Sequence, residues 1–222
     1  MTAQPLAARL RQATATAHRT AESTGWAATL ATGRVRRATY AAYLAALTEI
    51  YAALEDAVAA HVSHPAIAVV HDPGLQRLSA LRADLARWGE PAETPAVRAA
   101  TIAYVDRLEH VARSAPHRLL AHHYVRYLGD LSGGQVVASA LRTAGHDGVA
   151  FYDFSAVAES TRHGRPSTVP FLRRYREGLD AAALRAREAD EVVEEAVRAF
   201  DLTTQLFLAL DPPAADVTPS AG

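Results

Sequence analysis

The sequence has no cysteine, and this absence removes several kinds of chemistry at once. A chain without thiols has no disulfide, no thiolate metal site, no iron–sulfur cluster and no cysteine nucleophile. Lysine is missing as well, so all 23 basic residues are arginine. Together with the abundant alanine, this is the bias that GC-rich coding produces, and a single arginine is therefore weak evidence of function.

The sequence also lacks an excess of charge of either sign. Its 23 basic and 24 acidic residues give a formal net charge of -1, so the surface has no overall field that would gather nucleic acid or anionic lipid. No uncharged apolar run approaches the roughly 18 residues of a membrane span, and Met1–Leu6 does not begin a signal peptide. We therefore predict a cytoplasmic protein that has no membrane anchor and binds no nucleic acid.

Helical periodicity dominates the sequence. Apolar residues recur at steps of three and four, as in the stripe Tyr40, Leu44, Leu47, Tyr51 and Leu54. The only strand-like piece, residues 149–154, is too short to found a sheet. We predict an all-α, single-domain helical bundle of seven to eight helices over residues 1–211, followed by a flexible tail over residues 212–222.

A glycine-rich segment lies inside one of these helical patterns, between Leu119 and Leu141. Gly129, Gly133 and Gly134 fall there, and each glycine costs a helix about 1 kcal/mol relative to alanine. One interpretation is a helix that gains from the missing side chains, through a kink or a backbone that lies directly against a flat ligand. The other is a loop that joins two shorter helices.

A histidine near the N-terminus is a candidate metal ligand. His18 and Glu22 are four residues apart on the predicted first helix, so the carboxylate can hold one ring nitrogen and leave the other for a metal. A lone helical histidine is more often structural, so the spacing alone leaves both roles open. No Glu-x-x-His occurs, which excludes a di-iron carboxylate bundle. The adjacent His122 and His123 cannot face the same way on a helix.

Two charged runs have simple explanations. The segment Phe171–Arg176 places three arginines in four residues, which could bind the carboxylates of a ligand or an acidic protein, or only water. The glutamates of a later helix are most simply interpreted as a solvated face; they are Glu188, Glu191, Glu194 and Glu195.

Several of these segments together resemble the heme oxygenase family. The specific motif is Arg126–Val136, and the resemblance spans residues 10–210; supporting pieces are Leu10–Thr14 before His18, Ala21–Glu22 after it, Ile50–Glu55 and Gln205–Phe207. The resemblance implies a bundle of the heme oxygenase type that clamps a heme between two helices. His18 then matches the iron ligand and Glu22 the carboxylate that orients it. Gly129 and Gly133 match the helix on the opposite side, where backbone approaches the reacting oxygen.

The resemblance also implies a proton relay. Asp130 matches a carboxylate that delivers protons through ordered water, and Tyr51, Arg126 and Thr203 match positions that join or border this water network. Each of these three has a structural alternative, which is core packing for Tyr51, a salt bridge for Arg126 and helix packing for Thr203. By the same resemblance, further heme contacts fall at Ser132, Gly134 and Phe200.

The sequence departs from the family pattern at the heme propionates. Arg11 stands where relatives commonly have a lysine, and Leu172 occupies a second such position. Arg176 and Tyr124 are retained, and Arg173 is a candidate replacement for the second lysine. These departures bear on how the heme is seated, and hence on which ring position is opened.

The expected function is therefore the oxidative cleavage of heme b by O2 and reducing equivalents to biliverdin, carbon monoxide and ferrous iron. No nucleotide-binding fingerprint is present, so a separate ferredoxin or flavoprotein reductase is the expected electron donor. The alternative is a heme carrier or sensor on the same fold that does not turn over. A thiamin-degrading enzyme of the same fold is excluded, because that chemistry uses a cysteine.

Overall fold

The computed structural model describes residues 4–160 and 166–211. The predicted flexible tail, residues 212–222, lies outside the described residues. The α-helices are α1 (Leu6–Glu22), α2 (Gly25–Thr32), α3 (Arg37–Ala60), α4 (Pro65–Ala68), α5 (Leu78–Trp88), α6 (Pro95–Ser114), α7 (Leu119–His123), α8 (Gly129–Thr143), α9 (Val169–Ala181) and α10 (Ala186–Leu210). Two strands, β1 (Glu159–Ser160) and β2 (Pro166–Ser167), form one short antiparallel pair.

The all-α prediction is confirmed, but the predicted number of helices was too low. The described residues form ten α-helices instead of seven to eight. Two of them are very short: α4 has four residues and starts at Pro65, and α7 has five residues. Proline at the first position of a helix costs little because its missing N–H has no helical partner there, so even one turn can form. Apolar periodicity cannot reveal elements of this length.

The glycine-rich segment is helical, and the loop interpretation was wrong. A π-helical turn, η3 (Tyr124–Leu128), joins α7 directly to α8, so the chain stays helical from Leu119 to Thr143. A π-turn inserts an extra residue into the helix and shifts the register of the side chains on either side of it. The π-turn therefore changes which way the Arg126 side chain and the glycine-bearing face of α8 are turned, compared with a regular helix.

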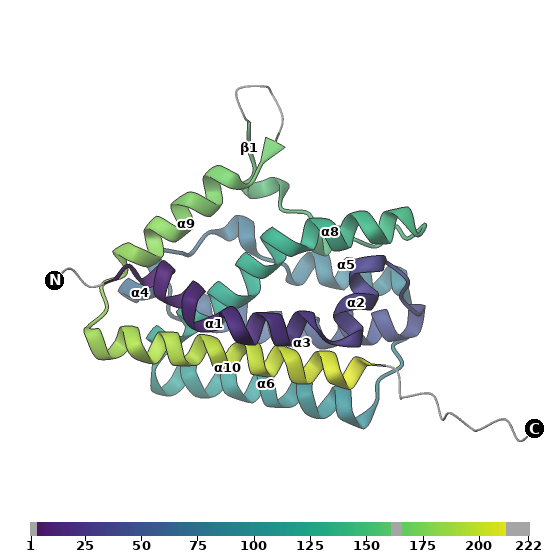
Figure 1. The fold of residues 1–222 in the computed structure, drawn as a ribbon, viewed down its shortest axis with the longest axis horizontal. Helices are drawn as coiled ribbons and strands as arrows, with labels where there is room; N and C mark the ends of the chain where they lie inside the picture. The colour runs from purple at the N-terminus through teal and green to yellow at the C-terminus, as the bar shows by residue number, and fades with distance from the viewer. Residues whose placement is uncertain (1–3, 161–165, 212–222) are drawn as a thin grey trace, which may run out of the picture.

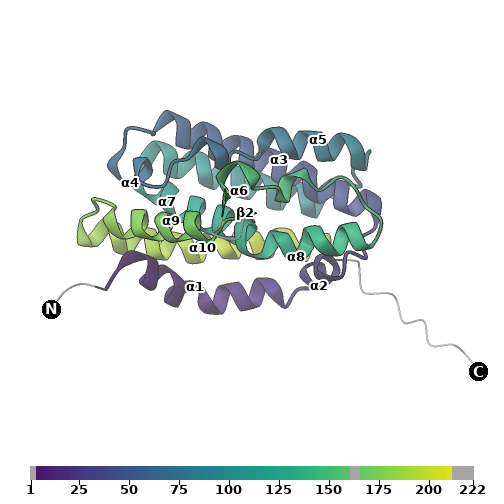
Figure 2. The same ribbon diagram turned by 90° about the horizontal axis from the view of Figure 1, so that it is seen from above.

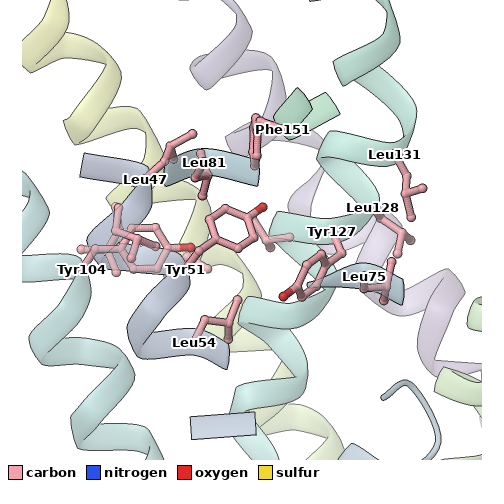
Figure 3. Packing of buried hydrophobic residues seen from close by; sticks show 14 of the residues in the cluster. Leu47, Tyr51, Leu54, Leu75, Leu81, Tyr104, Tyr127, Leu128, Leu131 and Phe151 are labelled. Atoms are coloured by element: carbon pink, nitrogen blue, oxygen red, sulfur yellow. The ribbon is translucent and has the colours of Figure 1, made fainter. Parts of the chain in front are cut away.

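The core is built around α3, as its apolar stripe predicted. Tyr40, Leu44, Leu47, Tyr51 and Leu54 are all completely buried. Helix α3 packs against α5 and α6, and its tyrosines contact aromatic rings from other segments. Figure 3 shows Tyr51 inside this cluster, near Tyr127 and Phe151. One continuous hydrophobic cluster thus connects most of the elements in the described ranges.

Helix α1 lies on one side of the bundle, where it packs along α10 (Figure 1). Seen from above, α1 and α2 follow one side of the molecule and α3, α4 and α5 the other, with α8, α9 and α10 between them (Figure 2). Gly33 ends α2 with φ 67°, and a Cβ there would lie 2.4 Å from the carbonyl oxygen of Ala140. This glycine therefore allows α2 to approach α8 closely and closes one end of the space between α1 and α8.

The strand-like piece predicted at residues 149–154 folds as a 3₁₀ turn over Ala150–Tyr152. The buried Asp84 carboxylate accepts hydrogen bonds from the backbone N–H groups of Ala150 at 2.9 Å and Phe151 at 2.7 Å. These two bonds fix the start of the turn and hold Tyr152 in the interior.

The prediction of a solvated glutamate face on α10 was wrong for Glu195. Its side chain is buried, and it accepts hydrogen bonds from Arg107 of α6 and from His122 at 3.0 Å. The neighbouring His123 instead bonds the hydroxyl of Tyr175 at 2.7 Å, which confirms that the two histidines face different ways. Burial lowers the pKa of His123 to about 3, so this ring is neutral. The two histidines are structural links from the α7 region to α10 and α9.

Among the described helices, none combines the length and the apolar composition that crossing a bilayer requires. The cytoplasmic location stays a prediction.

Candidate functional site

A cleft runs between α1 on one side and the η3–α8 segment on the other. It has an outer part of about 1170 Å³ and an inner part of about 450 Å³ that reaches toward α2 and α3. The inner part has the size of a typical ligand pocket, and the outer part is somewhat larger. The residues that line both parts are His18, Glu22, Val125, Gly129, Gly133 and Phe200.

His18 faces this cleft from α1. Its Nδ1 atom lies 3.0 Å from Glu22 Oε2, one turn further along the same helix. The ring also packs edge-on against Phe200 of α10, with 5.4 Å between the centroids. The carboxylate fixes Nδ1 as the N–H donor, so the Nε2 lone pair is left for a ligand. The imidazole is half exposed because the cleft in front of it is open.

The opposite wall of the cleft is backbone. A Cβ built on Gly129 or Gly133 would meet nothing within 4 Å, although both residues line the cleft. Packing therefore does not require glycine at these positions. What the missing side chains provide is free space above the helix, of the kind that a flat ligand fills. Gly134 is different, because a Cβ there would lie 2.7 Å from the ring of Tyr152.

A buried polar group lies beside this wall. The Tyr51 hydroxyl of α3 donates a hydrogen bond to Asp130 Oδ2. Arg126 Nη2 lies 3.8 Å from Asp130 Oδ1, and the guanidinium is 5.3 Å from the centre of the Tyr51 ring. Burial raises the pKa of Asp130, and the charge of Arg126 and the hydrogen bond from Tyr51 only partly oppose this. The carboxyl group therefore holds a proton at higher pH than an exposed aspartate does.

Two tyrosines that no sequence motif marks as functional line the inner part of the cleft. Tyr43 comes from α3 and Tyr152 from the 3₁₀ turn. Nothing in the spacing marked them, since Tyr43 is one of three tyrosines on a largely buried helix and Tyr152 lies in a segment predicted to be strand-like. Thr203 lines the same part, and its hydroxyl bonds the carbonyl of Ala199 at 2.9 Å.

The outer part of the cleft gathers arginines. Arg11 and Arg176 line it together with Tyr124 and Ser132. Burial raises the pKa of Tyr124, while a hydrogen bond to Thr14 and the charges of both arginines oppose this rise.

Arg173 and Leu172 on α9 are the two positions that bear on the second propionate contact, and neither of them lines the cleft. Arg173 is not among the cleft residues; its side chain is 74% exposed and its Nε lies 3.8 Å from Glu177. Leu172 packs against the hydrophobic core. The position of Arg173 therefore does not support the predicted contact with a ligand.

The donor set decides what kind of metal compound fits this cleft. The residues that the structure describes contain no group of three or more His, Asp or Glu side chains that could hold a bare metal ion. A single imidazole holds iron firmly only when the ligand supplies the remaining donors, as the four nitrogens of a porphyrin do. His18 on one wall and the free space over Gly129 and Gly133 on the other fit such a flat compound.

Fold and cleft together define an all-α protein with a cleft between two helices that suits a flat, iron-containing ring compound. A family model described as heme oxygenase matches residues 4–209. The chain belongs to the heme oxygenase family, and its class of activity is that of a heme oxygenase.

Individual relatives agree with this assignment. The chain is 32% identical to heme oxygenase 1 of Nostoc sp. over 93% of this chain and 86% of the relative. It is 35% identical to human heme oxygenase 1 over 92% of this chain and 71% of the relative. The crystal structure of heme oxygenase-1 from the cyanobacterium Synechocystis in complex with heme superimposes with a TM-score of 0.80 at 31% identity, covering 92% of this chain and 91% of that one.

Proposed function

We propose that this chain cleaves heme b with O2 and externally supplied electrons, and that the products are biliverdin, carbon monoxide and ferrous iron. The observation that carries the proposal is that His18 and the bare backbone of Gly129 and Gly133 line one and the same cleft. When bound, the heme supplies the iron that activates O2 and the ring that is opened. The chain's own residues bind and orient it.

His18, with Glu22 behind it, is the proposed iron ligand. A neutral histidine would donate less electron density to a bound iron than a thiolate would. The Phe200 ring packs edge-on against the imidazole. The missing side chain of Gly134 leaves room for the Tyr152 ring beside α8. Ser132, Tyr124, Arg11 and Arg176 are the proposed contacts at the heme edge that carries the propionates, because arginine and hydroxyl groups pair well with carboxylates.

Asp130 is the proposed proton source. It is a carboxyl group with a raised pKa, it lines the inner part of the cleft, and no side chain at Gly129 or Gly133 blocks its way to the ligand. Water in the inner part would pass the proton on. Tyr51 holds one oxygen of the carboxyl group, and Arg126 and Thr203 border the same space. Because Gly129 and Gly133 have no side chains, neither position places an acid or a base in the cleft.

The electron donor is proposed to be an acidic ferredoxin or flavoprotein reductase. Arg11, Arg19 and Arg176 all line the outer part of the cleft, next to the proposed heme edge. A donor with an acidic surface would dock there and bring its redox group close to the heme.

The test is turnover. Hemin added to the purified chain is expected to give a Soret band, and reductant with O2 is expected to replace it with biliverdin absorbance and release carbon monoxide. His18→Ala is expected to lose normal ligation and turnover. Asp130→Ala is expected to bind heme but to lose most of the biliverdin yield.

Two results would count against this proposal. A Soret band that persists under O2 and reductant indicates a carrier or sensor, which is the alternative function on this fold. An unchanged biliverdin yield from Asp130→Ala contradicts the proton-source assignment while leaving the heme site intact.

A further inference from the structure

Helix α1, which carries His18, has no side-chain cap of its own. Its N-cap residue is Pro5, which forms no side-chain hydrogen bond to the helix. The first backbone N–H groups of a helix have no helical partner, so an oxygen from water or from another part of the protein satisfies them. Asp180 near the end of α9 supplies such an oxygen, because the backbone N–H of Ala7 donates a hydrogen bond to its Oδ1 atom at 2.8 Å. The carboxylate also has the sign of charge that the N-terminus of a helix favours.

The helix that presents Asp180 is itself fixed to the body of the protein. Tyr175 of α9 is buried, and its hydroxyl bonds a ring nitrogen of His123 at 2.7 Å. Gly178 lies so close to the residue that ends α4 that a Cβ on it would clash with the carbonyl oxygen of Val69. The end of α9 thereby comes down to the start of α1 (Figure 1). Asp180 therefore holds the start of α1 at a place that the packing of α9 determines.

This hydrogen bond lies one helical turn away from two arginines of the outer cleft. Ala7 precedes Arg11 by four residues on α1, and Asp180 follows Arg176 by four residues on α9. Residues that are four apart in a helix lie on the same face. All four of these residues line the outer part of the cleft. The two guanidinium groups repel each other because they carry like charges, and the bond between Ala7 and Asp180 holds their two helices together beside them.

We propose that Asp180 is a positioning residue, which sets the spacing between Arg11 and Arg176 by bonding the backbone of α1. These arginines are the proposed partners of the heme propionates, so their spacing decides how the heme is turned within its own plane. That rotation selects the ring position that is opened. A carboxylate repels propionates, so Asp180 acts through α1 and not as a partner of the heme. The inference rests on the proposed function and names a residue that fixes its regiochemistry.

The first measurement needs no heme. Asp180→Ala removes the acceptor, and hydrogen exchange of the Ala7 amide, followed by NMR, is expected to become about 2- to 30-fold faster, the change that corresponds to losing a helix cap. Asp180→Asn keeps an acceptor oxygen and is expected to exchange like the wild type. Glu177→Ala is the matched control, because it removes an exposed carboxylate of the same helix whose partner is Arg173. Unchanged exchange in Asp180→Ala, or equally fast exchange in Glu177→Ala, overturns the contact.

The second measurement reports how the heme is seated, whether or not it is cleaved. Hemin and cyanide are added to the protein, and proton NMR compares the shifts of the heme methyl groups, which depend on how the heme is turned relative to the histidine ring. Asp180→Ala is expected to change this pattern and Asp180→Asn to keep it. An unchanged pattern in Asp180→Ala overturns the proposal. An equal change in Asp180→Asn overturns it as well, because the charge and not the hydrogen bond would then be responsible.

A double variant distinguishes the link between the helices from a cap that serves α1 alone. Serine at the N-cap accepts a hydrogen bond from the first turn of its own helix, so Pro5→Ser together with Asp180→Ala supplies a cap without the link to α9. The slow exchange of the Ala7 amide is expected to return, while the changed pattern of heme methyl shifts persists. If both return to the wild-type values, Asp180 only caps α1, and its role in spacing the arginines is wrong.

The products of turnover give an independent comparison. Asp180→Ala is expected to shift the ratio of biliverdin isomers by about twofold or more, whereas Asp180→Asn keeps the wild-type ratio. An unchanged ratio in Asp180→Ala overturns the proposal. If the wild type binds hemin and forms no biliverdin, the proposed function fails, and the heme methyl shifts alone still decide whether Asp180 positions the heme. A failure of this inference is thereby distinguished from a failure of the proposed function.

Discussion

Replacing Gly133 by alanine should have opposite effects on the stability of the heme-free protein and on its affinity for heme. Gly133 is the fifth residue of α8, and alanine is favoured over glycine within a helix by about 1 kcal/mol. A Cβ at this position meets no atom within 4 Å, so the substitution adds no clash and fills no hole in the heme-free protein. The heme-free variant should therefore be more stable than the wild type by about 0.5 to 1 kcal/mol.

The same methyl group should harm heme binding. It projects into the cleft on the wall opposite His18, where a flat ligand would pass directly over the backbone. Forcing an extra methyl group into a closely packed contact costs about 1 to 3 kcal/mol, and about 1.4 kcal/mol corresponds to a tenfold loss of affinity. We expect a loss of heme affinity of about tenfold or more, together with a lower biliverdin yield.

The neighbouring Gly134 provides the control. A Cβ there would lie 2.7 Å from the ring of Tyr152, so Gly134→Ala should destabilise the heme-free protein in spite of its better helix propensity. Urea unfolding of the heme-free proteins and a hemin titration followed at the Soret band measure the two effects separately. If Gly133→Ala is less stable than the wild type, or is more stable but binds and cleaves heme normally, the assignment of this wall is wrong.

Three further predictions follow from other contacts. Burial alone would raise the pKa of Glu195, but the hydrogen bonds from Arg107 and His122 outweigh burial and lower the pKa to about 2. The lowered pKa contributes roughly 3 kcal/mol of folding stability above pH 4.5. This contribution should be lost as the pH falls toward 2. Acid unfolding followed by circular dichroism should show this loss, and Glu195→Gln should be less stable at neutral pH but less sensitive to acid; equal acid sensitivity would falsify the linkage. Glu22→Ala should weaken heme binding by about 10- to 100-fold, because it removes the hydrogen-bond acceptor on which the orientation of the histidine ligand depends. A hemin titration that gives wild-type affinity would contradict that role. Arg176→Leu should weaken heme binding about tenfold or more and alter the biliverdin isomer ratio, whereas the exposed Arg173→Leu should do neither, and equal effects of the two would refute the assignment of the propionate end.

Helices α3 and α10 show how much of the structure the sequence could predict. The stripe of α3 specified both its helical form and its buried face, since period and burial are the same information on a long amphipathic helix. On α10, four glutamates had the composition of a solvated face, yet Glu195 is buried against Arg107 and His122. Its partners come from α6 and α7, far away in sequence, so no local pattern could identify it.

The sequence by itself determined the helical class, the resemblance to heme oxygenase, and the pairing of His18 with Glu22, because these depend on neighbours within one or two turns. The tertiary structure decided that the glycines are helical and face free space, that Tyr43 and Tyr152 line the cleft, and that Arg173 is not among the residues that line it. These outcomes depend on a π-turn and on how α2 and the 3₁₀ turn Ala150–Tyr152 pack against α8. Such packing is set by contacts between residues far apart along the chain, and a single sequence carries no local signal for them.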